Sequence, residues 1–464
     1  MNRIVPLILA VALFMEMMDS TVIATSLPAI AADIGTSPIA LKLALTTYLV
    51  ALAIFIPASG WMADRFGARR VFMIAIAIFT LGSLLCARAD SLAAFVGARF
   101  IQGMGGSMMT PVARLVLVRA TERNRLVEAM SWLSVPALMG PLVGPVVGGF
   151  LTTFVSWHWI FLINLPIGLA GIAASKRFLP ELAGKPNGRL DAVGLALSGL
   201  AASGIVFGLS VISLPALPEA VGFAAVAIGA ACAVLYVRHA LKIPGPVLDL
   251  SLLATPSFRV SVLSGSLVRL GIGATPFLLP LTLQIGFGLS AFHSGLVTFV
   301  GAIGAITMKF AAATVYARFG FKPVLLATIA LSGLLLTSMS FFSPRMSFAV
   351  IYSILLAAGL VRSLMFTGFN ALTFAELENE QAGAGTAIAA VFQQISLALG
   401  VAIAGMLVEA SMAWRGTGDP GLADFQLAFF AISLFSLAAL MPMLTLSREA
   451  GATVSGHGAP ASEH

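Results

Sequence analysis

GWMADRFGARR, at residues 60–70, recurs in degraded form as AATVYARFGFK at residues 312–322. Aligning Gly67 with Gly320 gives an offset of 253 residues and brings two Arg-Phe-Gly triplets into register. Each stretch separates two long apolar runs, so the two stretches agree in their surroundings as well as in their residues. Because a short string rarely repeats by chance at equivalent places, the sequence predicts an internal duplication.

The composition predicts that most of the chain lies in a membrane. Of 464 residues, 59% are hydrophobic and 10% are charged, against roughly 25% charged in an ordinary soluble domain. Apolar runs of about 20 residues, enough for a helix to cross the hydrocarbon core, recur from end to end. We predict an all-α membrane protein with 14 transmembrane helices, at residues 5–26, 43–63, 71–87, 92–117, 127–152, 157–176, 191–213, 218–238, 259–284, 292–315, 323–342, 346–371, 382–409 and 423–446.

The basic residues between these runs indicate the orientation of the chain. With the N-terminus in the cytoplasm, seventeen Lys and Arg residues fall in cytoplasmic segments and four in periplasmic ones, namely Lys42, Arg88, Arg345 and Arg415. Because basic residues are retained on the cytoplasmic side, we expect a multi-pass protein of the bacterial inner membrane with both termini cytoplasmic. The same pattern explains the net charge of +7 without a nucleic-acid partner.

The duplication and the span count together predict the domain organisation. We expect an N-terminal six-helix lobe at residues 1–178, a linker with two extra helices at 179–240, and a C-terminal six-helix lobe at 241–446. Residues 447–464 are predicted to form a disordered cytoplasmic tail. Parallel halves related by an axis along the membrane normal are one known way to build alternating access.

Three motifs in the first half have an interpretable chemistry. In the loop motif, glycines permit close approach and a turn, Asp64 can cap or pair at a helix end, and arginines anchor the loop at the anionic cytoplasmic face. Its candidate gating residues are Gly60, Asp64, Arg65, Gly67, Arg69 and Arg70. Within the fourth span, RFIQGMGG begins with Arg99 and includes Gln102. An arginine in hydrocarbon should face a partner in the protein interior, and a clamp to backbone carbonyls is the alternative.

The fifth span carries GPLVGPVVGG at residues 140–149. Glycine at every fourth residue leaves one helix face without side chains, so another backbone can approach closely, while the prolines bend the helix. The candidate residues are Gly140, Pro141, Gly144, Pro145, Gly148 and Gly149. A packing seam without directional meaning is the alternative.

These motifs resemble those of the major facilitator superfamily. Residues 60–70 resemble its loop between helices 2 and 3, and residues 99–106 resemble a fourth-helix motif, which implies a part for Arg99 in proton coupling. The glycine-rich fifth span resembles the motif of exporting members. DSTVIATSLP at 19–28 and WHWIFLINLP at 157–166 resemble signatures of the 14-helix drug:proton antiporters, although Ala24 stands where asparagine is usual.

The few ionisable residues deep within spans are the default functional candidates. Glu16 and Asp19, three residues apart, share one helix face, and two carboxylates in a desolvated cavity would make at least one able to bind a proton. Asp19 fits the family motif, whereas Glu16 either adds affinity for cations or caps a cavity wall. The second half contributes the cations Arg269, Lys309 and Arg362 and the polar candidates Asn370, Gln284 and Gln394.

The 253-residue offset places Glu16 on Arg269, so the two halves would present an acid and a base at equivalent positions. We therefore expect a salt bridge across a central cavity that holds one conformation closed until substrate or a proton breaks it.

We predict proton-coupled secondary active efflux of amphipathic, cationic or zwitterionic small molecules by a monomer. A dedicated exporter of a single metabolite, anionic or otherwise, is the alternative, and a non-transporting membrane sensor is a remote one. The sequence has no G-x-x-x-x-G-K-[ST] pattern for ATP and no clustered histidines. We accordingly expect no enzymatic activity, metal or cofactor, with the proton gradient as the energy source.

Overall fold

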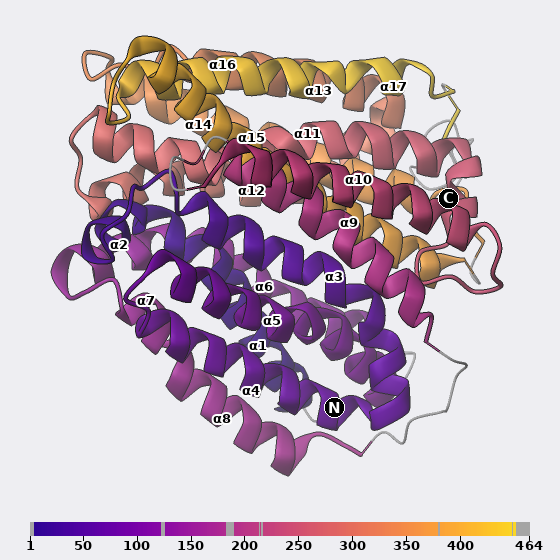
Figure 1. Cartoon of the computed structure of the whole chain (residues 1–464). Helices are drawn as coiled ribbons and strands as arrows, with labels where there is room; N and C mark the ends of the chain where they lie inside the picture. Colours follow the sequence, from indigo (N-terminus) through magenta and orange to yellow (C-terminus); the bar gives the residue numbers. More distant parts are fainter. Residues whose placement is uncertain are drawn as a thin grey trace. The chain divides into compact units, whose positions relative to one another are not determined.

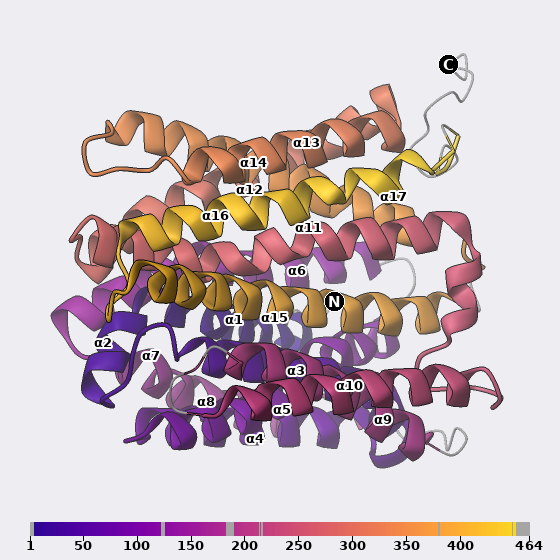
Figure 2. The same ribbon diagram turned by 45° about the horizontal axis from the view of Figure 1, so that its top comes forward.

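The computed structural model describes residues 4–121, 126–181, 190–212, 214, 217–378, 381–447 and 449–451, with no side chains at 126–131 and 134–138. Within these ranges every regular element is a helix, as Figure 1 and Figure 2 show from two directions. The all-α class predicted from composition is confirmed. The predicted tail falls almost entirely outside the described residues, so its disorder stays a prediction.

The chain divides into two compact units. Unit 1 comprises Met1–Tyr236, Gly245–Val247 and Gly288–Phe299, and unit 2 comprises Val237–Pro244, Leu248–Phe287 and the chain from Val300 onward. The helices of unit 1 are α1 (Ile4–Val22), η1 (Ile23–Thr25), α2 (Leu27–Asp33), α3 (Lys42–Phe66), α4 (Ala68–Ala87), α5 (Leu92–Ala120), α6 (Leu126–Phe154), α7 (Trp159–Leu162), α8 (Asn164–Phe178), α9 (Ala192–Val211) and most of α10 (Glu219–Ala240).

The helices of unit 2 repeat the long-helix pattern of unit 1. They are η3 (Leu250–Ala254), α11 (Pro256–Leu281), the π-helix η4 (Thr282–Gly286), α12 (Ala291–Phe319) from Val300 onward, α13 (Phe321–Met339), α14 (Phe348–Phe374), α15 (Ala382–Arg415), α16 (Leu422–Ala438) and α17 (Leu440–Leu444). Several long α-helices contain internal prolines that do not end them: α3 continues through Pro57, α5 through Pro111, and α11 through Pro276 and Pro280.

Twelve segments of the described residues are long and apolar enough to cross a membrane. The other two predicted spans coincide with α5 and α6, each 29 residues long. Arg99 and Gln102 lower the mean hydropathy of α5, and α6 is only partly described. The prediction of 14 spans is therefore confirmed for twelve, and helices occupy the positions of the remaining two.

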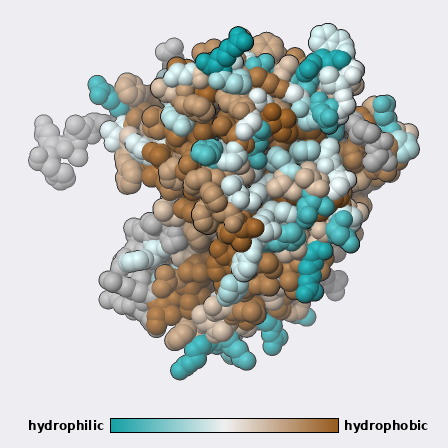
Figure 3. All heavy atoms as spheres, turned by 90° about the vertical axis from the view of Figure 1, so that its left-hand side faces the viewer, coloured by the Kyte–Doolittle hydropathy of each residue, from teal (hydrophilic) through white to brown (hydrophobic). Residues whose placement is uncertain are grey.

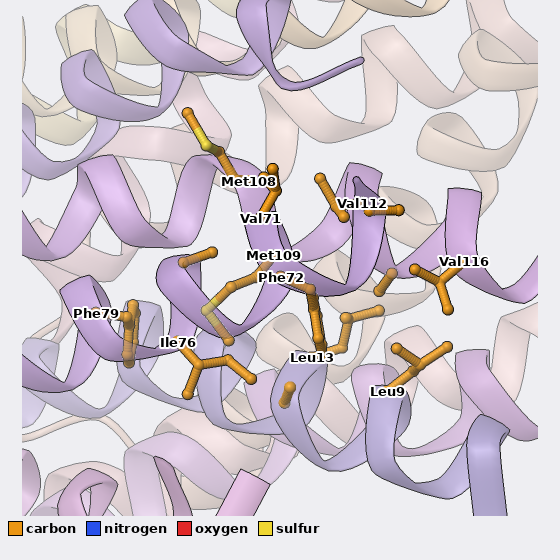
Figure 4. Close-up of a cluster of buried hydrophobic side chains, with 14 of the residues drawn as sticks. Leu9, Leu13, Val71, Phe72, Ile76, Phe79, Met108, Met109, Val112 and Val116 are labelled. Carbon is orange, nitrogen blue, oxygen red and sulfur yellow. The ribbon is translucent and has the colours of Figure 1, made fainter. Parts of the chain in front are cut away.

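The core of unit 1 lies where α1, α4 and α5 pack together. Figure 4 shows Leu9 and Leu13 of α1 beside Phe72 and Ile76 of α4 and Met109 of α5. All five side chains are buried. Tight apolar packing of this kind fixes the helices against one another, and it holds α1 and α5, which carry buried polar groups, in contact.

The two repeated stretches form the same tight turn in the two units. Gly67 (φ 87°) separates α3 from α4, and Gly320 (φ 76°) separates α12 from α13. Glycine adopts a positive φ without the steric cost that other residues meet. The loop expected between the spans is thus a single glycine, because α3 continues through Asp64 and Arg65 to Phe66.

Large hydrophobic side chains cover much of the molecule's outer surface. Phe310, Trp414 and Met441 are 86%, 85% and 74% exposed, and hydrophobic residues occupy much of the face shown in Figure 3. Soluble monomers rarely expose extensive apolar patches. Helices with satisfied backbones and apolar exteriors are the structures that suit a lipid bilayer.

Candidate functional site

Asp19 of α1 lies at the centre of a buried polar network in unit 1. Its carboxylate accepts hydrogen bonds from Arg99 Nη1 at 2.7 Å, Gln102 Nε2 at 2.8 Å and Asn164 Nδ2 at 2.9 Å. The side chains of Asp19 and Arg99 are 0% and 1% exposed. Since removing two charges from water is costly, such a pair persists only with good geometry and further hydrogen bonds.

Further contacts supply those hydrogen bonds. Arg99 Nη1 also donates to Gln102 Oε1 at 2.6 Å, and the guanidinium carbon lies 4.3 Å from the ring centroid of Tyr48. Ser83 Oγ accepts from Gln102 at 2.7 Å and from Asn164 at 3.2 Å. The network therefore joins α1, α3, α4, α5 and α8 around one buried ion pair, and in this structure Arg99 pairs with a carboxylate rather than with backbone carbonyls.

Glycines bring the helix backbones close enough for this network. A side chain at Gly103 would collide with the carbonyl oxygen of Tyr48 in α3, and one at Gly105 would collide with the backbone of Phe79 in α4. On α4, a Cβ at Gly82 would lie 2.5 Å from the Cα of Gln102. The glycines after Gln102 thus allow α5 to fit between α3 and α4, which buries the charged end of the motif.

Glu16 lies on the same helix, but its surroundings differ. The side chain is buried, and Oε2 accepts a hydrogen bond from Thr110 Oγ1 of α5 at 2.9 Å. Among the described residues no cation forms an ion pair with Glu16, although Arg114 and Asp19 are near enough to act on it electrostatically. Glu16 can therefore bind a proton without breaking a salt bridge, whereas Asp19 cannot.

The glycine stripe of α6 packs against α1. Side chains at Gly140, Gly144 and Gly148 would meet Met17 Cβ, Thr21 Oγ1 and the Val22 carbonyl oxygen respectively. Side-chain hydrogen bonds tie the same seam, from Thr25 Oγ1 to the Pro145 carbonyl at 3.4 Å and between Ser26 and Thr152 at 2.7 Å. The prolines leave α6 continuous, with Pro145 buried and Pro141 exposed, while Gly149 lies against Ala291 at the start of α12. The backbone that the stripe admits is α1, next to the two acids.

The loop motif of residues 60–70 forms ion pairs at helix ends. Asp64 accepts from Arg119 of α5 at 2.7 Å, and Arg69 donates to the Leu179 carbonyl at 3.1 Å and to Glu181. Arg65 and Arg70 are exposed. The expected close approach at Gly60 is wrong for this structure, because a side chain there would meet no heavy atom within 4 Å.

The candidate site residues of unit 2 differ in how deeply they are buried. Arg269 of α11 is buried, with its guanidinium carbon 5.7 Å from the Phe366 ring of α14. Arg362, Gln284 and Gln394 are half-buried, and Lys309 and Asn370 are exposed. The predicted salt bridge between Glu16 and Arg269 joins residues of different units and stays a prediction.

Four partners in unit 1 were not predicted from the sequence, namely Asn164, Ser83, Tyr48 and Thr110. Asn164 left a signal, since it is an amide in the apolar sixth span. The other three are common residues whose spacing carries no such signal. No group of three or more His, Cys, Asp or Glu side chains suited to a metal occurs in the described ranges.

The chain that carries this network is similar to known proteins over most of its length. Residues 9–258 and 261–461 match the sequence profile described as Major Facilitator Superfamily. The chain belongs to the Major Facilitator Superfamily. This facilitator is accordingly a multi-pass membrane transporter and not an enzyme, and the superfamily resemblance noted in the sequence is confirmed.

Relatives and solved structures cover nearly the whole facilitator. It is 38% identical over 410 residues to "Putative multidrug resistance protein MdtD" of Salmonella paratyphi B, covering 86% of this chain and 85% of the relative. A protein of the same name from Cronobacter sakazakii is 36% identical over 444 residues, covering 95% and 93%.

Two solved structures share the fold of this facilitator. A D-xylose-proton symporter has a TM-score of 0.68 at 16% identity, covering 97% of this chain and 98% of its own. An auto-inhibited POT family peptide transporter has a TM-score of 0.68 at 15% identity, covering 100% and 98%. At such identities the likeness concerns the fold alone, and each printed substrate belongs to that protein.

Proposed function

We propose that this facilitator couples the entry of protons to the export of amphipathic small molecules. The observation that carries the proposal is the pair of buried acids in α1, of which Asp19 is neutralised by Arg99 and Glu16 is not. An acid buried in a membrane helix marks a proton or ion pathway by default. The drug-resistance names of the relatives and the resemblance to exporting facilitators support export over uptake.

Within this proposal the two acids have different roles. Glu16 binds and releases the coupling proton, because its only described hydrogen-bond partner is the hydroxyl of Thr110. Asp19 pairs with Arg99 and holds α1, α5 and α8 together. The family motif favours Asp19 as the functional acid. The contacts of the two side chains favour Glu16 as the proton carrier instead.

The proton gradient is sufficient to drive such export. Moving one proton down a membrane potential of 100 mV releases about 2.3 kcal/mol, and each 1.4 kcal/mol corresponds to about a tenfold concentration ratio. We further propose that the protein acts as a monomer in the bacterial inner membrane with both termini in the cytoplasm. The multidrug resistance names of the relatives argue against the remote alternative of a non-transporting sensor.

Transport in proteoliposomes tests the coupling. Vesicles with an acidic lumen should accumulate norfloxacin, a zwitterionic amphipathic probe, about tenfold above protein-free vesicles. Glu16→Gln should abolish the gradient-driven accumulation and keep downhill exchange, because a neutral glutamine mimics a permanently protonated acid. Glu219→Gln, at an exposed acid of α10, is the matched control and should behave as the wild type.

Three outcomes would overturn parts of the proposal. Accumulation that ignores the pH gradient in the wild type would refute proton coupling. Full accumulation by Glu16→Gln would remove Glu16 from the coupling path. If Asp19→Asn abolished uphill transport but spared downhill exchange while Glu16→Gln retained both, the coupling site would be Asp19.

A further inference from the structure

Two arginines of unit 2 lie on helices that pack against each other within the membrane-spanning region. Arg269 of α11 is 7% exposed and lies beside Phe366 of α14, at 5.7 Å from the ring centroid. Arg362 precedes Phe366 by four residues and therefore lies on the same face of α14, one turn away. Arg269 thus contacts the Phe366 ring, and Arg362 lies one turn before Phe366 on α14.

These cations have no counter-charge in the part of the chain that the structure describes. Neither Arg269 nor Arg362 forms a salt bridge or a hydrogen bond there, and the buried Nε of Arg269 has no acceptor. Arginine stays protonated in proteins, so it cannot escape the cost of burial by losing its charge. Arg415, at the end of α15, shows the usual solution, since it pairs with Asp424 at 2.9 Å.

Two hydroxyls near the arginines also lack partners. The buried Oγ atoms of Ser266 and Ser363 form no hydrogen bond among the described residues. Ser266 precedes Arg269 by three residues, and Ser363 precedes Phe366 by three, so each shares a helix face with the group it precedes. Unpaired buried donors cost free energy, and a ligand rich in oxygen acceptors at these helix faces would supply the kind of acceptor that they lack.

The face of α14 that carries Arg362 is accessible along its length. Arg362, Phe366 and Asn370 follow at intervals of four, and each retains accessible surface, with Phe366 at 38%. A charged side chain and an amide facing lipid would be costly. We therefore take this stripe to line an aqueous route.

We propose that the α11–α14 site binds the anionic group of the transported molecule, a carboxylate, sulfonate or phosphate held by Arg269 and Arg362. Guanidinium groups bind such anions through paired, charge-assisted hydrogen bonds, and the exposed ring of Phe366 offers contact to the adjoining apolar part. The inference rests on the proposed function, because the bound anion is a transported molecule only if the protein exports small molecules. It narrows the expected substrates to zwitterionic or anionic amphiphiles.

Equilibrium binding tests the site without any gradient. The full chain in phosphatidylcholine nanodiscs is titrated with N-dansyl-leucine, an anion, and with N-dansyl-leucinamide, its neutral analogue, and dansyl fluorescence is recorded. We expect the wild type to bind the carboxylate about tenfold to a hundredfold more tightly than the amide. Arg269→Gln and Arg362→Gln should each remove most of this preference and leave amide binding unchanged.

Two further variants guard against unfolding and non-specific charge effects. Arg269→Lys keeps the charge and should recover part of the preference. Arg345→Gln, on the exposed segment between α13 and α14, removes an equivalent charge and should leave the preference intact. Arg362 is half-buried, so its replacement tests the site even if Arg269→Gln fails to fold.

Several results would overturn the proposal. Equal binding of the two probes by the wild type would do so, as would retention of the preference in the folded Arg362→Gln and Arg269→Gln variants. If phosphatidylglycerol in the nanodisc abolished the preference, the site would hold a lipid headgroup instead of a transported anion. Because binding needs no proton gradient, Glu16→Gln should keep the preference, so failure of the coupling proposal is distinguishable from failure of this one.

Discussion

Asp19 and Glu16 are three residues apart, yet different neighbours give them different chemistry. Asp19 accepts three hydrogen bonds and pairs with Arg99 at under 2% exposure for both side chains, whereas Glu16 accepts one from a hydroxyl. Removing one member of a buried ion pair leaves the other charge uncompensated, which costs far more than removing both. The pair should therefore show strong coupling in stability.

A double-mutant cycle measures that coupling. Asp19→Asn or Arg99→Gln alone should lower the free energy of unfolding by about 3–5 kcal/mol, and the double variant should lose clearly less than the sum. Thermal unfolding in detergent, followed by tryptophan fluorescence, gives the comparison. The pair of Asp64 and Arg119, also at 2.7 Å but only partly buried, is the matched control and should couple by about 0–1 kcal/mol. Additive losses at Asp19 and Arg99 would refute a structural role for the pair.

At the scale of the element, α6 determines where α1 lies. Each glycine of the stripe contacts a different group of α1, because a Cβ at Gly144 would meet the side-chain oxygen of Thr21, while one at Gly148 would meet the carbonyl oxygen of Val22. A side chain can turn away or be shortened, but a helical carbonyl cannot. The two positions should therefore respond differently to the same substitution.

We expect Gly144→Ala and Gly148→Ala each to reduce norfloxacin transport about tenfold or more, because α1 and its acids are displaced from α5. Thr21→Ala should rescue Gly144→Ala in part by removing the atom that the new methyl group meets. It should not rescue Gly148→Ala. Transport rates per inserted protein in proteoliposomes provide the measurement.

Gly60→Ala is the matched control for these substitutions, since Gly60 also lies within a helix but has open space around it. Its transport should stay near the wild-type level. If both stripe variants also transported normally, the seam would be dispensable, and equal rescue of both by Thr21→Ala would contradict the described packing.

The helices were more predictable than the contacts between them. Apolar runs bounded by charges predicted each long helix because a membrane span must be long and apolar, and the spacing of glycines predicted the seam. The partner of Arg99 could not be predicted, because it depends on how three helices pack around Asp19. Ser83 and Thr110 are small polar residues of a kind common in apolar helices, so the sequence does not single them out. Only the packing of the helices places them beside Gln102 and Glu16.

At the scale of the whole molecule, the duplication extends from sequence to contacts. The offset that aligns Gly67 with Gly320 also aligns Arg69 with Lys322. Arg69 donates to the Leu179 carbonyl after α8, and Lys322 donates to the Leu444 carbonyl of α17 at 2.9 Å. In unit 1 the basic residue after the glycine turn thus ties α4 to the end of α8, and in unit 2 it ties α13 to the end of α17.

The inserted pair, α9 and α10, has no counterpart in this repeat and belongs mainly to unit 1. Gly199 of α9 lies against Ile54 of α3, and close approach at Gly204 and Gly229 joins α9 to α10. These helices have 20 and 22 residues, enough for each to cross the hydrocarbon core once. If each helix crosses once, the segment between α9 and α10 lies on the opposite side of the membrane from the segments before α9 and after α10.

Cysteine accessibility tests that topology directly. In a background without Cys86 and Cys232, Leu217→Cys and Ser290→Cys should react with a membrane-impermeant maleimide in intact spheroplasts. Glu181→Cys and Lys242→Cys should react only after permeabilisation, because basic residues hold their segments in the cytoplasm. Glu181, Leu217 and Lys242 are exposed, so lack of labelling would reflect the side of the membrane and not burial. If positions 181 and 217 were labelled from the same side, α9 would not cross the membrane and the fourteen-span architecture would be wrong.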